Sequence, residues 1–144
     1  MRTRPMIILM ADDDADDRML TQDALDESRV VNELVCVEDG EQLLAYLRRE
    51  PPFEDAPRPG LILLDLNMPK KDGREALEEL KADPQLRRIP VVVLTTSKAE
   101  EDLLRSYDLG AASFITKPVT FDALVELMKA LGRYWIEFVE LPPS

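Results

Sequence analysis

Five short, mainly apolar runs divide this chain. Each is four to six residues long. A continuous apolar run of this length is typical of a strand that is covered on both faces, whereas a half-exposed strand alternates apolar and polar residues. The sequence therefore predicts strands at residues 6–11, 34–37, 61–66, 90–95 and 113–116.

Stretches with the apolar spacing of amphipathic helices follow these runs. They predict helices at residues 15–28, 40–49, 75–82, 97–109 and 121–131. Gly110 can end the fourth helix in a left-handed conformation, and Thr120 can cap the fifth. The first helix should carry one apolar stripe, made of Met19, Leu20, Ala24 and Leu25.

The alternation of strands and helices indicates the fold class. Residues 50–60 contain four prolines and can only form a loop. Elsewhere a strand is followed by a helix five times, and helical crossovers of this length join parallel strands. We therefore predict an α/β domain over residues 1–132. It is a doubly wound, five-stranded parallel sheet with helices on both faces, and residues 133–144 form a C-terminal extension.

Charged residues lie at the ends of three of the predicted strands or directly after them. Asp12 and Asp13 come after the first strand, Asp65 lies near the end of the third, and Lys117 follows the fifth. The carboxyl ends of parallel strands meet at one edge of a sheet, where α/β proteins bind their ligands. We therefore expect these carboxylates and the ammonium group to converge at that edge.

Carboxylates this close together repel one another unless a cation lies among them. Asp13, Asp65 and the backbone carbonyl of Asn67 would supply oxygen ligands to Mg²⁺, with Mn²⁺ as a substitute. Lys117 would offset part of the repulsion and the charge of an incoming phosphoryl group. The sequence thus predicts a site for a divalent cation and a phosphoryl group.

Composition excludes several other classes of function. The net charge of −11 over 144 residues opposes binding to nucleic acid or to an anionic membrane surface. Asp16 and Asp17 contribute to it and are expected to be the solvated start of a helix. There is no histidine, which excludes histidine metal ligands and a histidine general base. We expect the single cysteine, Cys36, to be a buried thiol in a cytoplasmic protein.

Several motifs occur together in a fixed order. They are the acidic pair after the first strand, the segment 63–69 around Asp65 with Asp72-Gly73, Thr95 at the end of the fourth strand, Gly110-Ala111 and Lys117-Pro118. With these motifs, residues 6 to about 131 resemble the receiver domains of two-component response regulators. The resemblance implies a flavodoxin-like receiver fold.

The resemblance also implies roles at the site. Asp65 would be the phosphoacceptor. Asp12 and Asp13 would be the magnesium pair, with Asp13 as a direct ligand and Asp12 acting through water. Lys117 would bind a phosphoryl oxygen.

A conformational switch is implied as well. Thr95 would be the switch hydroxyl, and Phe114 the aromatic residue whose rotamer reports the switch.

The phosphoryl group would come from the phosphohistidine of a sensor histidine kinase. The chain would then be a signalling phosphoacceptor, not an enzyme in the ordinary sense, and it would act through partner proteins or onward phosphotransfer. We expect no DNA-binding output domain.

Three segments, at residues 65–73, 94–98 and 131–135, resemble the single-domain regulators that partner with bacterial phytochrome histidine kinases.

Two alternatives to a phosphorylated receiver stay open. A degenerate receiver that serves only as a docking module would be expected to lack Asp13, Asp65 or Lys117. A phosphatase of the haloacid dehalogenase type would need a second aspartate two residues after its nucleophile, where this chain has Asn67.

The C-terminal extension is rich in apolar residues. It follows Gly132, which offers a helix stop, and its large apolar side chains include Tyr134, Trp135, Ile136, Phe138 and Val139. This composition favours a strand, although Leu131, Trp135 and Phe138 would also continue a helix. We expect the arm to contact a second copy and form a homodimer. The alternative is that it folds back on its own domain.

Overall fold

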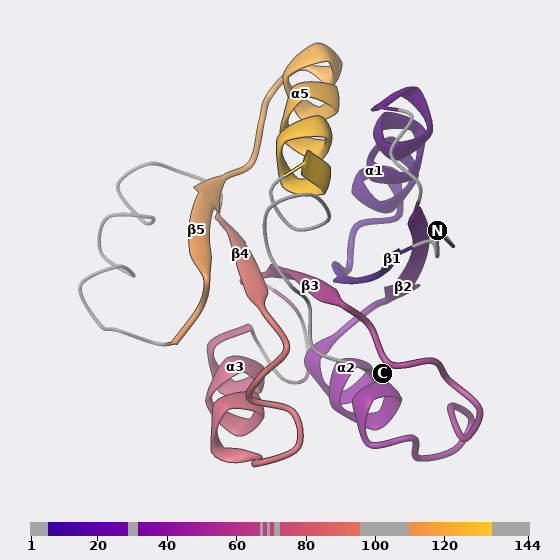
Figure 1. Ribbon diagram of the computed structural model, residues 1–144, viewed down its shortest axis with the longest axis vertical. Helices are drawn as coiled ribbons and strands as arrows, with labels where there is room; N and C mark the ends of the chain where they lie inside the picture. Colours follow the sequence, from indigo (N-terminus) through magenta and orange to yellow (C-terminus); the bar gives the residue numbers. More distant parts are fainter. Residues whose placement is uncertain are drawn as a thin grey trace, which may run out of the picture.

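Five parallel strands form the centre of the molecule in this computed structural model, which describes residues 6–28, 32–66, 68, 70, 73–95 and 110–133. The strand order is β2-β1-β3-β4-β5 (Figure 1). The predicted fold class is confirmed. The strands are β1 (Met6–Ala11), β2 (Asn32–Val37), β3 (Leu61–Asp65), β4 (Val91–Thr95) and β5 (Ser113–Thr116).

Helices cover both faces of this sheet. Figure 1 shows α1 (Ala15–Ser28) and α5 (Phe121–Gly132) together on one side, and α2 (Gly40–Leu47) and α3 (Gly73–Ala82) on the other. The helix expected at residues 97–109 lies outside the described residues. Within the described ranges, every helix is too short or too polar to cross a membrane.

The hydrophobic core has two layers, one on each face of the sheet. Ile62 packs with Leu64 and Val93 toward α2 and α3, whereas Leu61 and Leu63 pack toward α1 and α5. Because both faces of the central strands are covered, their sequences are apolar throughout rather than alternating. This two-sided burial gives the strand ends a fixed position.

Side chains cap three helix starts in the described residues. At the start of α1, Asp14 Oδ1 accepts a hydrogen bond from the backbone N–H of Asp16 at 2.8 Å. Thr120 accepts a hydrogen bond from the backbone N–H of Ala123 at 3.1 Å, as predicted, and Asp39 accepts one from Gln42 at 2.8 Å at the start of α2. Gly110 has a φ of +82°, the left-handed conformation expected for it. Arg49 has a φ of +55°, so α2 ends at Leu47, two residues earlier than expected.

The apolar stripe predicted for α1 is only half correct. Ala24 and Leu25 are buried, but they share the buried face with Thr21. Met19 and Leu20 are 60% and 44% exposed. The face of α1 that packs against the sheet therefore differs from the predicted one, because it includes Thr21 and excludes Met19 and Leu20.

The prediction of a buried Cys36 is wrong. Cys36 is exposed, whereas the next residue, Val37, is buried. The reason is the position of β2 at the edge of the sheet, next to β1 alone. An edge strand is covered less completely than a central one, so an apolar run there does not imply burial.

Gly132 does not stop α5. The helix includes Gly132, and Arg133 keeps helical backbone angles of φ −62° and ψ −48°. The structure thus agrees with continuation of the helix as far as Arg133. Residues 134–144, which make up all but the first residue of the expected dimer arm, lie outside the described residues.

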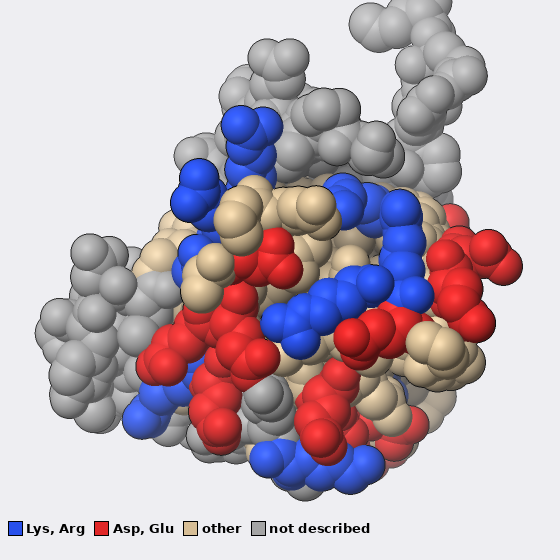
Figure 2. Space-filling model, turned by 90° about the horizontal axis from the view of Figure 1, so that it is seen from below, with Lys and Arg blue, Asp and Glu red and all other residues tan. Residues whose placement is uncertain are grey.

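Charged side chains of both signs are interspersed on the end of the molecule that carries α2 and α3. Figure 2 looks at this end from below, and acidic and basic groups alternate across the described residues drawn there. The charges on this face are thus mixed, although the chain as a whole is strongly acidic.

Candidate functional site

The end of β1 places Asp12 in the interior. Its backbone N–H continues the pairing of β1 with β2 by donating to the carbonyl of Val37 at 3.1 Å, and its side chain is fully buried. Asp12 Oδ1 accepts a hydrogen bond from the backbone N–H of Asp14 at 2.9 Å. The guanidinium of Arg18 donates to the backbone carbonyl of Asp12 at 2.7 Å. Asp13, the next residue, is exposed and points its carboxylate toward the same site.

Asp65 ends β3 and is also buried. The chain returns close to it at the start of α3, where the N–H of Gly73 donates to the carbonyl of Leu66 at 2.9 Å. A Cβ atom on Gly73 would lie 2.7 Å from the backbone oxygen of Asp65. Only glycine permits this approach, which explains the Gly residue here. Lys70, between these two points of the chain, places its Nζ 3.7 Å from the buried carboxylate of Asp39.

Lys117 follows β5 and brings a positive charge to these acids. Its Nζ lies 3.1 Å from Asp12 Oδ2 and 3.5 Å from Asp65 Oδ2. The predicted convergence of the strand-end residues is therefore present in the structure. It follows from the parallel sheet, because β1, β3 and β5 all end at the same edge.

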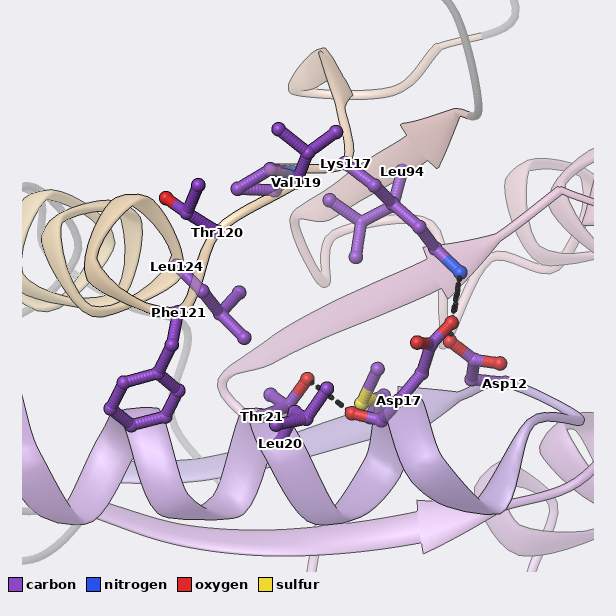
Figure 3. Close-up of a pocket in the computed structure, with 12 residues that line it drawn as sticks. Asp12, Asp17, Leu20, Thr21, Leu94, Lys117, Val119, Thr120, Phe121 and Leu124 are labelled. Carbon is purple, nitrogen blue, oxygen red and sulfur yellow. Dashed lines mark hydrogen bonds and ion pairs between the residues drawn. The ribbon is translucent and has the colours of Figure 1, made fainter.

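The structure adds one residue to this group. Asp17 was expected to be solvated, but its Oδ2 lies 2.9 Å from Lys117 Nζ (Figure 3). Asp17 lies four residues before the buried Thr21, so it belongs to the face of α1 that meets the sheet. The helical spacing of Thr21, Ala24 and Leu25 was the feature of the sequence that could have placed Asp17 on this face. Asp16, on the adjacent position of the helix, is exposed as expected.

Two opposing effects act on the pKa of Lys117. Burial by itself would lower it, because the charged form loses hydration. The hydrogen bond to Asp17 and the charges of Asp65 and Asp12 outweigh burial and hold the pKa above the ordinary value for a lysine. Lys117 is therefore charged throughout the physiological range.

The carboxylates of Asp12, Asp13 and Asp65 fit a divalent cation. Each can place one oxygen so that all three oxygens lie within 4.8 Å of one another. Carboxylate oxygens are the ligands that Mg²⁺ and Mn²⁺ prefer. Asn67, whose backbone carbonyl was expected as a further ligand, lies outside the described residues.

The expected switch residues lie on neighbouring strands. Phe114 is buried in the core layer beneath α2 and α3. It pairs in register with Val93, and Thr95 pairs with Thr116. The backbone of Thr95 ends β4, and its side chain lies outside the described part of the structure.

A cavity of about 100 Å³ adjoins Lys117 and Asp17 between α1 and the start of α5. Figure 3 shows Leu20, Val119 and Phe121 around it, with Lys117 and Asp17 on one side. These three apolar side chains are each exposed by more than 40%, so the charged site opens beside an apolar surface.

Comparisons with known proteins agree with one another. A family model described as the response regulator receiver domain matches residues 8–129. The chain is 44% identical over 140 residues to response regulator Rcp1 of Synechocystis sp., covering 97% of this chain and 95% of that protein.

Solved structures show the same similarity. The phosphorylated cyanobacterial phytochrome response regulator RcpA has 46% identity and a TM-score of 0.87, with 97% of this chain and 100% of that chain covered. The Mn²⁺-bound form of Rcp1 has 44% identity and a TM-score of 0.84, with 96% and 100% covered.

Substitution of Lys117 by methionine tests the electrostatic role of the ammonium group. We expect Lys117→Met to lower the free energy of unfolding of the metal-free protein by about 1–2 kcal/mol at neutral pH, because the buried Asp12 loses its partner. The loss should be constant from neutral pH up to pH 10.5, the ordinary pKa of lysine. It should shrink as pH rises through the higher pKa of the folded protein, where wild-type Lys117 loses its proton.

Urea unfolding of both proteins across this pH range measures the difference. Lys129→Met is the matched control, because Lys129 is exposed and pairs only with the exposed Glu126 in the described structure. We expect it to change stability by less than about 0.5 kcal/mol. Equal effects of the two substitutions would contradict this account of Lys117.

Proposed function

Because this chain belongs to the response regulator receiver domain family, we propose that it accepts a phosphoryl group on Asp65 from the phosphohistidine of a sensor histidine kinase. The observation that carries the proposal is the cluster of Asp12, Asp13 and Asp65 beside the ammonium group of Lys117. Transfer of a phosphoryl group depends mainly on positioning and on neutralisation of charge, which such a cluster can provide.

In the proposed reaction, a carboxylate oxygen of Asp65 attacks phosphorus. The phosphorus–oxygen bond forms as the phosphorus–nitrogen bond of the phosphohistidine breaks, and the bonding electrons stay with the imidazole. Lys117 donates to a phosphoryl oxygen as charge develops there. The product is an aspartyl phosphate, which the same site would later hydrolyse.

Asp12, Asp13 and Asp65, together with the backbone carbonyl of Asn67, would hold Mg²⁺, with Asp13 as a direct ligand and Asp12 acting through water. When bound, the cation supplies positive charge to the phosphoryl oxygens and to the attacking carboxylate. The relative Rcp1 has been solved in an Mn²⁺-bound form, which supports Mn²⁺ as a substitute.

The proposal assigns the conformational response to Thr95 and Phe114. The hydroxyl of Thr95 would donate to the phosphoryl group, and the resulting movement would change the space available to Phe114. In the register of β4 and β5, Thr95 lies two positions beyond the Val93–Phe114 pair, which supports such coupling. Phosphorylation would then bias an equilibrium between two conformations.

The proposed partner is a sensor histidine kinase of the bacteriophytochrome type, because RcpA is a phytochrome response regulator. The exposed apolar residues Leu20, Val119 and Phe121 beside Lys117 are suited to contact with a protein. The net charge of −11 disfavours nucleic acid and anionic membranes as partners. The proposal places the chain in the cytoplasm, where Cys36 would stay reduced.

Phosphorylation of defined variants tests this function. We expect the wild type, incubated with acetyl phosphate and Mg²⁺, to gain one phosphoryl group in its intact mass. Asp65→Asn should gain none because the nucleophile is absent, and Asp13→Asn should lose most of the product because a cation ligand is removed. Asp23→Asn, an exposed change on α1, should behave as the wild type.

An adduct that persists in Asp65→Asn would refute the assignment of the phosphoacceptor. A wild type that accepts no phosphoryl group from acetyl phosphate or from a phosphohistidine donor would favour the docking-only module.

We also propose a homodimer held by the C-terminal arm, residues 133–144. The support is the apolar character of the arm in the sequence: large side chains would be left in water if they had no partner surface. A symmetric pair would bury two arms at once. The arm would thus link two receiver domains of residues 1–132.

Deletion of the arm tests the dimer. We expect removal of residues 133–144, which leaves α5 complete to Gly132, to give a folded and phosphorylatable monomer, because the contacts between subunits are lost while the domain core is kept. Light scattering at micromolar concentration gives the mass of each form. Full-length protein that is monomeric under these conditions would overturn the proposed dimer.

A further inference from the structure

The ammonium group of Lys117 is shared unequally among three carboxylates. Its Nζ lies 2.9 Å from Asp17, 3.1 Å from Asp12 and 3.5 Å from Asp65. An ammonium group has three N–H donors, so these partners can occupy all of them. The shortest contact goes to Asp17, which is not one of the three carboxylates grouped as a cation site.

We propose that Asp17 is a positioning residue that competes with the phosphoryl group for Lys117 and thereby sets the charge balance at the phosphoacceptor. This inference rests on the proposed function of Asp65. It concerns a residue whose effect on the phosphoryl group passes through Lys117.

The burial of the three partners indicates which contact is exchanged. The side chain of Asp12 is fully buried, and Asp65 is nearly so, whereas the side chain of Asp17 is 37% exposed. If Lys117 turned away from Asp12, a buried carboxylate would be left without its ammonium partner, which is costly. Water can solvate Asp17 instead, so the contact with Asp17 is the one that Lys117 gives up at least cost.

The backbone around Asp17 is held by hydrogen bonds that do not involve its carboxylate. The hydroxyl of Thr21 donates to the backbone carbonyl of Asp17 at 2.8 Å, and the N–H of Asp17 donates to Asp14 at 3.3 Å. Among the described residues, Lys117 is the only partner of the Asp17 carboxylate. Figure 3 shows this carboxylate directed at Lys117 from the first turn of α1. Asp17 can therefore release Lys117 without unfolding the helix.

The negative charge of Asp17 should act in opposite directions on the two ligands of the site. It attracts a divalent cation to the cluster. It also repels an anionic phosphodonor, and it holds the ammonium group of Lys117, which would otherwise bind that donor. Removal of this charge should therefore weaken cation binding and strengthen the interaction with the donor. General damage to the site would weaken both.

The test compares Asp17→Asn with Asp16→Asn. The two changes remove the same charge from adjacent positions, and the amide of asparagine keeps an oxygen that can accept from Lys117. Asp16 is exposed, and in the described structure its side chain has no contact with Lys117. Mn²⁺ affinity is measured by electron paramagnetic resonance of the free ion. The dependence of the phosphorylation rate on acetyl phosphate concentration is measured at saturating Mg²⁺.

For Asp17→Asn we expect the dissociation constant for Mn²⁺ to rise roughly three- to tenfold and the half-saturating acetyl phosphate concentration to fall by a similar factor. Asp16→Asn should change each by less than about twofold. The differences should shrink at high salt, which screens exposed charge.

Three results would overturn the inference. Weaker binding of both ligands in Asp17→Asn would make Asp17 a structural support of Lys117. Identical behaviour of the two variants would make the Asp17–Lys117 pair a surface ion pair without influence on the site. A wild type that binds Mn²⁺ but accepts no phosphoryl group would overturn the proposed function itself, and with it the role of Asp17.

Discussion

The ion pairs of Lys117 are the interaction on which the rest of this site depends. Its ammonium group lies within 3.5 Å of carboxylate oxygens from Asp12, Asp17 and Asp65. Asp12 is fully buried, and an ionised carboxylate in that position is stable only with a close cation or hydrogen-bond donors. Asp13 adds a further negative charge at the same place. One lysine cannot neutralise all of these groups, so an additional cation would be attracted to the site.

The fold makes this arrangement possible because the ends of strands β1 and β3 are fixed by the packing of the sheet. Residues of these strands, such as Leu9, Leu63 and Leu64, are fully buried on both faces of the sheet. The close approach of Gly73 to the backbone of Asp65 brings the start of α3 against the end of β3. The carboxylates are therefore held near one another before any ligand arrives, which is the preorganisation that stabilisation of a transferring phosphoryl group requires.

The sequence was sufficient to predict the sheet and the convergence of Asp12, Asp13, Asp65 and Lys117, because each lies at the end of an unambiguous apolar run or just beyond it. The burial and contacts of residues whose environment depends on the exact packing were harder to predict. Asp17 was missed because the face of α1 that meets the sheet is marked by Thr21 rather than by Met19 or Leu20. Cys36 was misplaced because an apolar run does not reveal that β2 is an edge strand.

The central claim is that an excess of carboxylate charge around Lys117 creates a cation site, and the dependence of stability on Mg²⁺ tests it most directly. The free energy of unfolding of the wild type should rise with the logarithm of Mg²⁺ concentration once the site begins to fill, because the cation binds the folded state. In Asp13→Asn this rise should be largely lost. A wild type that is insensitive to Mg²⁺, or an Asp13→Asn variant that gains as much stability as the wild type, would contradict the account.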